Sequence, residues 1–252
     1  MARIRLDQRV LALGLVASRE RARACIIAGD VTVNGVAVTK AGALIADDAP
    51  VALRVPDHPW VGRGGIKLDH AMRVFGVDPT GATALDIGAS TGGFTDVLLE
   101  RGAARVVALD VGHGQLDWKL RRDPRVVVIE GANARHLRPT DLPAETRIFD
   151  LVTIDVSFIS LRHLWAVVPP LLRTGGRVIA LVKPQFEAGR PEVRAGGLVT
   201  DPAVHARVIV EVLSAAHQVG LRHVQTEPSP ITGAEGNREF LVLLAPSATP
   251  GP

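Results

Sequence analysis

The fold of the larger part of the chain is set by one segment, Ala84-Leu-Asp-Ile-Gly-Ala-Ser-Thr-Gly-Gly-Phe94. Its first four residues are apolar except for Asp86 and predict a short buried strand. The glycine-rich stretch that follows predicts a tight loop that leads into a helix at Thr95. Glycines in such a loop allow a ligand to approach the backbone closely, because no side chain stands in between. The segment therefore predicts a strand, a loop and a helix with a ligand site at the loop.

Short apolar runs rich in β-branched residues alternate with helical stretches on the C-terminal side of this segment, as buried parallel strands require. We expect strands at Val106–Leu109, Val126–Ile129, Leu151–Ile154 and Val178–Val182, and then at Leu221–Thr226 and Glu239–Leu244. The last two would form an antiparallel pair at one edge. With the strand Ala84–Ile87, the pattern predicts an α/β fold with a doubly wound, mostly parallel sheet of seven strands.

The N-terminal part of the chain has a different pattern and predicts a separate small α+β domain. Apolar residues at Leu6, Val10 and Leu13 predict a short amphipathic helix. A second helix is expected to begin after Ser18, a residue that caps helices well, and to end near Gly29.

Two alternating apolar runs then flank Asn34-Gly35 within Val31–Val38, which is the pattern of a β-hairpin. Two helices followed by this hairpin resemble the small RNA-binding module of a ribosomal small-subunit protein and of pseudouridine synthases. We place this RNA-binding domain at residues 1–56. A linker follows at 57–62, where the prolines of Pro56-Asp-His-Pro59 oppose regular structure, and the larger α/β domain occupies 63–252.

Basic residues gather at the N-terminus, where arginines outnumber the acidic residues Asp7 and Glu20. A solvated helix surface is the ordinary interpretation of such a run. The resemblance to an RNA-binding module favours contacts with RNA phosphates instead. The candidate RNA-binding residues are Arg3, Arg5, Arg9, Arg19, Arg21 and Arg23, together with Arg63 at the start of the larger domain.

Composition excludes several classes of protein. With 47% hydrophobic and 22% charged residues, the chain can form a packed core, and a pI of about 9.6 favours a polyanionic partner. Cys25 is the one cysteine, which excludes an internal disulfide and a cysteine-rich metal site. No apolar run approaches the ~18 residues of a membrane span, and none resembles a signal peptide. We expect a soluble cytoplasmic protein without a metal.

A second acidic residue, Asp110, stands at the end of the next expected strand, where a carboxylate can accept both hydroxyls of a ribose. The glycine loop and this acid together indicate a cofactor that contains adenosine. A nicotinamide dinucleotide and S-adenosylmethionine both fit. Asp86 favours the second, because a carboxylate in the loop would repel a pyrophosphate but attract ammonium and sulfonium charges. A role for Asp86 in stabilising the loop is the alternative.

The candidate cofactor site extends from the loop to the ends of the neighbouring strands. The stretch Val111-Gly-His-Gly-Gln115 would border an adenine, and Asn133 would contact the edge of that base. The candidate cofactor-binding residues are Asp86, Gly88, Ser90, Thr91, Gly92, Gly93, Phe94, Asp110, Val111, Asn133 and Asp155.

Two charged residues interrupt apolar sequence where central strands end. Asp155 follows Leu151–Ile154, and Lys183 follows Val178–Val182. Charges at the mouths of buried strands are costly unless they are paired, so we expect a desolvated ion pair, with a purely structural pair as the alternative. Lys67 and Glu239 are further candidates, although each alone could be a surface charge.

With these residues the chain resembles the TlyA (haemolysin A) family of ribosomal RNA 2′-O-methyltransferases, and its C-terminal part resembles the FtsJ-like enzymes. The resemblance covers nearly the whole chain. It is carried by Trp60-Val-Gly-Arg-Gly-Gly-Ile-Lys67, Asp86-Ile-Gly-Ala-Ser-Thr-Gly-Gly-Phe94, Asp110-Val-Gly-His-Gly-Gln115, Asp155-Val-Ser-Phe-Ile-Ser160, Leu181-Val-Lys-Pro-Gln-Phe-Glu187 and Gly236-Asn-Arg-Glu239.

The resemblance implies a Rossmann-type methyltransferase that uses S-adenosylmethionine and acts on ribosomal RNA or a ribosomal subunit. It implies a catalytic tetrad of Lys67, Asp155, Lys183 and Glu239 at a cytidine ribose. We assign Lys183 as the general base, Asp155 and Glu239 as orienting carboxylates, and Lys67 as the charge that stabilises the emerging alkoxide. Burial favours the neutral amine of Lys183 and Asp155 favours the charged one, so the sequence leaves its protonation open.

Two features depart from the pattern of the family. His58 and Pro59 stand where an arginine often precedes Trp60, which puts in doubt a linker contact by that guanidinium. The chain also ends soon after its last strand, without the basic extensions of members that modify both subunits. We therefore expect 23S rRNA as the target and keep 16S rRNA as the alternative. A catalytically inactive assembly factor and a membrane-active haemolysin are rival functions, and the oligomeric state, monomer or weak dimer, stays open.

Overall fold

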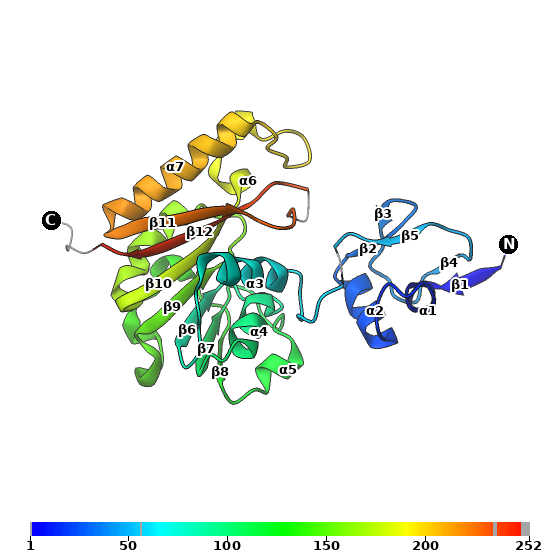
Figure 1. Cartoon of the computed structure of the whole chain (residues 1–252), viewed down its shortest axis with the longest axis horizontal. Helices are drawn as coiled ribbons and strands as arrows, with labels where there is room; N and C mark the ends of the chain where they lie inside the picture. The colour runs from blue at the N-terminus through cyan, green and yellow to red at the C-terminus, as the bar shows by residue number, and fades with distance from the viewer. Residues whose placement is uncertain (1, 56, 234–235, 248–252) are drawn as a thin grey trace. The chain divides into compact units, whose positions relative to one another are not determined.

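The computed structural model describes residues 2–55, 57–233 and 236–247, and the chain divides into two compact units between Pro59 and Trp60 (Figure 1). Pro56, the first proline of the stretch that predicted the linker, lies outside the described residues. Each unit has hydrophobic core clusters of its own.

The N-terminal unit contains both predicted helices, α1 (Leu6–Ala12) and α2 (Arg19–Ile27). Ser18 begins α2, because its side-chain oxygen accepts a hydrogen bond from the backbone N–H of Arg21 at 3.1 Å. The apolar faces of the two helices pack together with Val31 into one small core.

Short strands complete the N-terminal unit. β2 (Val31–Val33) and β3 (Val36–Ala37) form the predicted hairpin, with Asn34 and Gly35 at its tip in the left-handed region, at φ of 53° and 80°. Three strands were not predicted, because runs of three residues are too short to show an alternation. They are β5 (Val51–Leu53), which pairs with β2, and β1 (Arg3–Arg5), which pairs with β4 (Leu44–Ala46).

The C-terminal unit is built on one sheet with the strand order β11-β12-β10-β9-β6-β7-β8 (Figure 1). Neighbours from β10 to β8 are parallel, whereas β12 is antiparallel to both β10 and β11. This topology confirms the predicted mostly parallel, seven-stranded sheet with an antiparallel edge pair. The strands are β6 (Thr83–Ile87), β7 (Arg105–Leu109), β8 (Val126–Ile129), β9 (Phe149–Ile154), β10 (Leu172–Val182), β11 (Leu221–Pro228) and β12 (Phe240–Pro246).

Most strands differ from their predicted bounds by one or two residues, and two of the differences matter here. β10 begins at Leu172, because the polar, glycine-containing stretch before Val178 hides its first half from an apolar pattern. β12 begins at Phe240, so Glu239 directly precedes the strand and is not its first residue.

Helices cover both faces of the sheet (Figure 1). The strands serve two cores, since Leu85 and Ile87 of β6 belong to one cluster and Ala84 belongs to the other. α3 and α4 pack on the face of Ala84, and α7 packs on the opposite face. The helices are α3 (Gly64–Phe75), α4 (Gly93–Glu100), α5 (Trp118–Arg121), α6 (Pro184–Glu187) and α7 (Pro202–Gln218).

Single 3₁₀ turns connect several of these elements. They are Ala134–His136, Pro139–Asp141, Ala144–Thr146, Leu161–His163, Trp165–Val167, Pro169–Leu171 and Arg190–Glu192. Across the described residues, the helices are all too short or too polar to cross a bilayer.

Candidate active site

Asp86 lies in β6 just before the glycine loop and is fully buried. One carboxylate oxygen accepts a hydrogen bond from the Thr95 hydroxyl of α4 at 2.7 Å, and the other accepts one from the Thr153 hydroxyl of β9 at 2.9 Å. Burial raises the pKa of Asp86 to about 7, against the opposing effect of these two hydroxyls. Asp86 therefore connects three elements beneath the loop, and its contact with a cofactor stays a prediction.

The loop itself passes very close to neighbouring elements. Gly88 has a φ of 85°, and a Cβ there would overlap the backbone carbonyl oxygen of Asp155. Gly92 has a φ of 97°, and a Cβ there would overlap the side chain of Leu120. Both positions require glycine, because other residues rarely adopt such backbone angles and would also clash.

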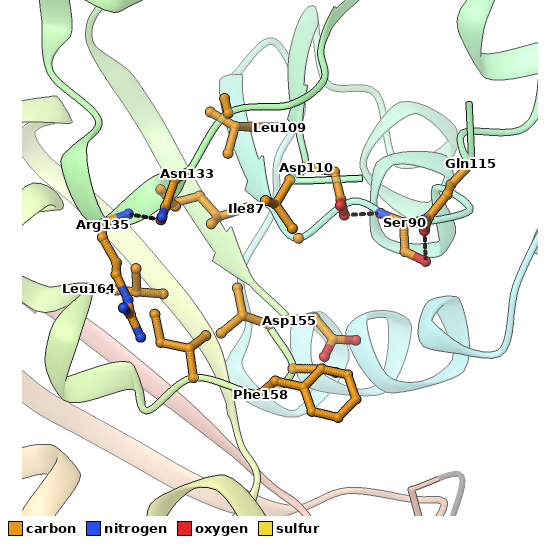
Figure 2. A pocket seen from close by; sticks show the side chains of 17 residues that line it. Ile87, Ser90, Leu109, Asp110, Gln115, Asn133, Arg135, Asp155, Phe158 and Leu164 are labelled. Carbon is orange, nitrogen blue, oxygen red and sulfur yellow. Dashed lines mark hydrogen bonds between the residues drawn. The ribbon is translucent and has the colours of Figure 1, made fainter. Parts of the chain in front are cut away.

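A cavity of about 460 Å³ opens beside this loop (Figure 2). The predicted cofactor-binding residues divide into two groups. Those that line the cavity are Gly88, Ser90, Asp110, Val111, Asn133 and Asp155. The remainder do not line it, and their contact with a cofactor stays a prediction: Asp86, Thr91, Gly92, Gly93 and Phe94.

The Asp110 carboxylate is fixed at the wall of the cavity (Figure 2). Oδ2 accepts a hydrogen bond from the backbone N–H of Ser90 at 2.8 Å, and Oδ1 accepts one from the backbone N–H of Gly112 at 2.7 Å. The Ser90 hydroxyl in turn donates to Gln115 at 3.2 Å. Each carboxylate oxygen has a second lone pair, so Asp110 can still accept hydrogen bonds from a ligand's hydroxyl groups.

Asp155 and Lys183 form the predicted ion pair, with Oδ1 and Nζ 2.6 Å apart. They follow β9 and β10, which are neighbouring parallel strands, so the topology brings them to the same edge of the sheet. Lys183 also donates a hydrogen bond to the Ser157 hydroxyl at 3.0 Å. The side chains are only 11% and 19% exposed for Lys183 and Asp155, so the pair is largely desolvated beside the cavity.

Lys67 and Glu239 form a second and more deeply buried ion pair, with Nζ and Oε2 2.5 Å apart. Lys67 projects from the first turn of α3, and Glu239 directly precedes β12. The start of α3 lies beside the first pair, because a Cβ at Gly64, three residues before Lys67, would lie 3.8 Å from a carboxylate oxygen of Asp155. The structure thus gathers all members of the predicted tetrad as two lysine–carboxylate pairs.

The loop after β9 and the turn after β8 add two residues to which the sequence pattern assigns no role. Phe158 lines the cavity, is 89% exposed and has a φ of 65°. Arg135 also lines the cavity, beside Asn133 and Leu164 (Figure 2). A phenylalanine beside an apolar strand is ordinarily buried, so the exposure of Phe158 could not be predicted from the sequence.

The candidate RNA-binding arginines of the N-terminal unit are held in part by acidic residues. Arg5 and Arg19 both donate to Asp7, and the hydrogen bond from Arg5 is the main reason that the pKa of Asp7 falls to about 2. Arg9 pairs with Asp47 and Arg21 with Asp57, whereas Arg3 and Arg23 are exposed. In the C-terminal unit, Arg63 donates to the backbone carbonyl of Thr232 at 3.4 Å.

Comparison with protein families identifies both parts of the chain. The model of the FtsJ-like methyltransferase family matches residues 60–245, and the model of the S4 domain matches residues 4–47. The chain therefore belongs to the FtsJ-like methyltransferases and carries an S4 domain in front of the enzyme domain. These matches confirm the family and the fold predicted from the sequence motifs.

Individual relatives extend over most of the chain. It is 43% identical over 246 residues to the 16S/23S rRNA (cytidine-2′-O)-methyltransferase TlyA of Mycobacterium tuberculosis, which covers 96% of this chain and 90% of that protein. It is 34% identical to the 23S rRNA (cytidine-2′-O)-methyltransferase TlyA of Campylobacter jejuni, over 72% of this chain and 69% of that one. A solved structure from Streptococcus thermophilus that carries a hemolysin name superposes with a TM-score of 0.77 at 41% identity, over 99% and 90% of the two chains.

Proposed function

We propose that this methyltransferase transfers a methyl group from S-adenosylmethionine to the ribose 2′-hydroxyl of a cytidine in ribosomal RNA. The observation that carries the proposal is the Lys183–Asp155 pair of 2.6 Å, whose aspartate lines the cavity beside the glycine loop. A base and a cofactor pocket at one sheet edge are what such a transfer requires. Both relatives act on cytidine riboses of ribosomal RNA according to their names.

The residues of the cavity fit S-adenosylmethionine. A volume of about 460 Å³ suits a nucleoside-sized ligand, and Asp110 has free lone pairs for the two hydroxyls of a ribose. Gly88 and Ser90 would hold the ligand from the loop, and Asn133 would contact the adenine edge. Asp155 brings negative charge to the side where a sulfonium would lie. The bound cofactor would supply the activated methyl group.

The two ion pairs would divide the work at the target hydroxyl. A ribose hydroxyl is a weak nucleophile, so a group must take its proton as the new carbon–oxygen bond forms. In its neutral amine form, Lys183 would accept that proton at Nζ and become the ammonium that pairs with Asp155, while Ser157 also holds its nitrogen in place. Lys67, oriented by Glu239 at 2.5 Å, would stabilise negative charge on the oxygen.

RNA recognition would begin in the S4 domain, which we place within residues 1–56 and connect through 57–62 to the enzyme domain at 63–252. Its support is the set of exposed or partly exposed arginines of residues 3–23, with Arg63 as a further contact. The shared part of the relatives' names is 23S rRNA, which makes the large subunit the preferred target. With ribosomal subunits as partners, the activity would lie in the cytoplasm.

The test is a mass-spectrometric map of methyl groups on ribosomal RNA from cells with and without this chain. The proposal expects a cytidine of 23S rRNA that loses one ribose methyl group when the chain is absent. Identical maps would refute it and would leave an assembly factor without activity as the better interpretation.

A further inference from the structure

Glu187 is a buried acid that belongs to neither ion pair. It ends α6, four residues after Lys183, and is only 4% exposed. Its Oε2 accepts a hydrogen bond from the Ser160 hydroxyl at 2.6 Å, and its Oε1 accepts one from the backbone N–H of Leu161 at 2.7 Å. Both donors stand at the far end of the loop that follows Asp155. Glu187 therefore joins the two segments that carry the Lys183–Asp155 pair.

These contacts complete a closed ring of interactions. The Asp155–Lys183 pair, 2.6 Å apart, connects the beginnings of the two segments. The rings of Phe158 and Phe186, with centroids 5.2 Å apart, connect their middles. The carboxylate of Glu187 connects their ends. A segment tied to its neighbour at three points has little freedom to move relative to it.

Arg162 strengthens the contact at Glu187. Its Nε lies 3.5 Å from the Glu187 carboxylate, and its guanidinium donates to the Glu187 backbone carbonyl at 3.0 Å. Burial raises the pKa of Glu187, against the hydrogen bonds from Ser160 and the backbone of Leu161. A buried carboxylate is costly to desolvate. The hydrogen bonds from these donors offset that cost for Glu187.

We propose that Glu187 is a positioning residue for the methyl transfer, which fixes the loop of residues 155–161 against α6. It thereby sets the position of Lys183 relative to Asp155 and the place of Phe158 in the cavity wall. The inference rests on the proposed function, in which Lys183 must reach a ribose hydroxyl. Glu187 itself does not line the cavity and touches no reacting atom.

Three variants test this role in single-turnover methyl transfer to ribosomal RNA, at a temperature at which circular dichroism shows each to be folded. Glu187→Ala removes both accepted hydrogen bonds, and a displaced catalytic group costs up to about 100-fold in rate. Glu187→Gln keeps an acceptor and the side-chain shape and should restore most of the rate. Glu211→Ala is the matched control, because it removes the other carboxylate partner of Arg162, at 3.4 Å, and should keep the wild-type rate.

Chemical labelling provides a readout that needs no turnover. Acetic anhydride labels accessible amines, and peptide mass spectrometry then reports Lys183 and Lys67 separately. In Glu187→Ala, Lys183 should be acetylated faster than in the wild type. The rate at Lys67 should be unchanged, because its partner Glu239 lies on a different segment.

The outcomes separate the two proposals. If the wild-type protein methylates no ribosomal RNA, the proposed function fails, whatever the labelling shows. If it does, a slow Glu187→Ala variant with faster labelling confined to Lys183 supports the positioning role. A wild-type rate for Glu187→Ala, or equally faster labelling of both lysines, overturns it, because the second result describes general loosening.

Discussion

The buried carboxyl of Asp86 makes the stability of the enzyme domain depend on pH. Burial raises its folded-state pKa from the ordinary 3.8 to about 7. A group whose pKa is raised on folding contributes stability that is fully present below its unfolded pKa. That contribution is lost as the pH rises through the folded pKa. The domain should therefore lose stability between about pH 4 and pH 7 on account of this one residue.

The size of the effect follows from the two pKa values. Each pKa unit corresponds to about 1.36 kcal/mol, so the complete loss is on the order of 4 kcal/mol. Of this loss in the free energy of unfolding, roughly 3 kcal/mol falls between pH 5 and pH 8, where it can be measured. Asp86→Asn removes the titration and keeps groups that can bond the Thr95 and Thr153 hydroxyls. The variant should thus gain stability relative to the wild type as the pH rises.

Urea unfolding of both proteins at pH 5, 6, 7 and 8 measures this gain. Asp78→Asn is the matched control, because the Thr80 hydroxyl lowers the pKa of Asp78 and confines its effect to more acidic pH. The difference in free energy of unfolding between Asp78→Asn and the wild type should stay constant from pH 5 to pH 8. A constant difference for Asp86→Asn as well would refute the reasoning, since the carboxyl would then titrate in the folded protein as it does in water.

Two further predictions concern the binding surfaces. Asp110→Ala should weaken binding of S-adenosylmethionine by about 10- to 100-fold, because it removes charge-assisted hydrogen bonds to a ribose; calorimetry measures this, and an unchanged Kd would exclude the assigned role. Replacing Arg5 and Arg19 by alanine should lower the salt dependence of ribosomal RNA binding by about one to two in the log–log slope, at unchanged cofactor affinity. A slope equal to that of the wild type would show that neither guanidinium contacts a phosphate.

Much of the site could be predicted because it stands at chain positions with strong local signals. Asp155 and Lys183 each end an apolar run, and neighbouring parallel strands must end at one edge, so their pairing followed from the strand pattern. Asp110 was recognisable for the same reason, at the end of β7. The pairing of Lys67 with Glu239 had no such local signal, because the two residues come from distant parts of the chain.

Other features depend on tertiary packing and leave no trace in a local pattern. The contact of Asp86 with a cofactor stays a prediction, but its hydrogen bonds to hydroxyls of α4 and β9 beneath the loop leave no signal in the sequence. Glu187 stands in a motif of the sequence, but its partner Ser160 is found only once the two loops are folded together. The strands β1, β4 and β5 are too short for an alternation to appear, and their pairing depends on the core of the N-terminal unit.

Methyl transfer by the purified protein tests the proposed chemistry most directly. Ribosomal subunits from cells that lack the chain are incubated with S-adenosylmethionine carrying an isotopically labelled methyl group, and the RNA is digested to nucleosides. We expect the label in 2′-O-methylcytidine, and we expect Lys183→Arg to transfer it at least ~100-fold more slowly, because arginine cannot give up a proton near neutral pH. Lys67→Arg should slow the transfer less, because arginine keeps the positive charge that is the proposed role of Lys67. Label on a base, no label at all, or a wild-type rate for Lys183→Arg would contradict a ribose methyl transfer with Lys183 as its base.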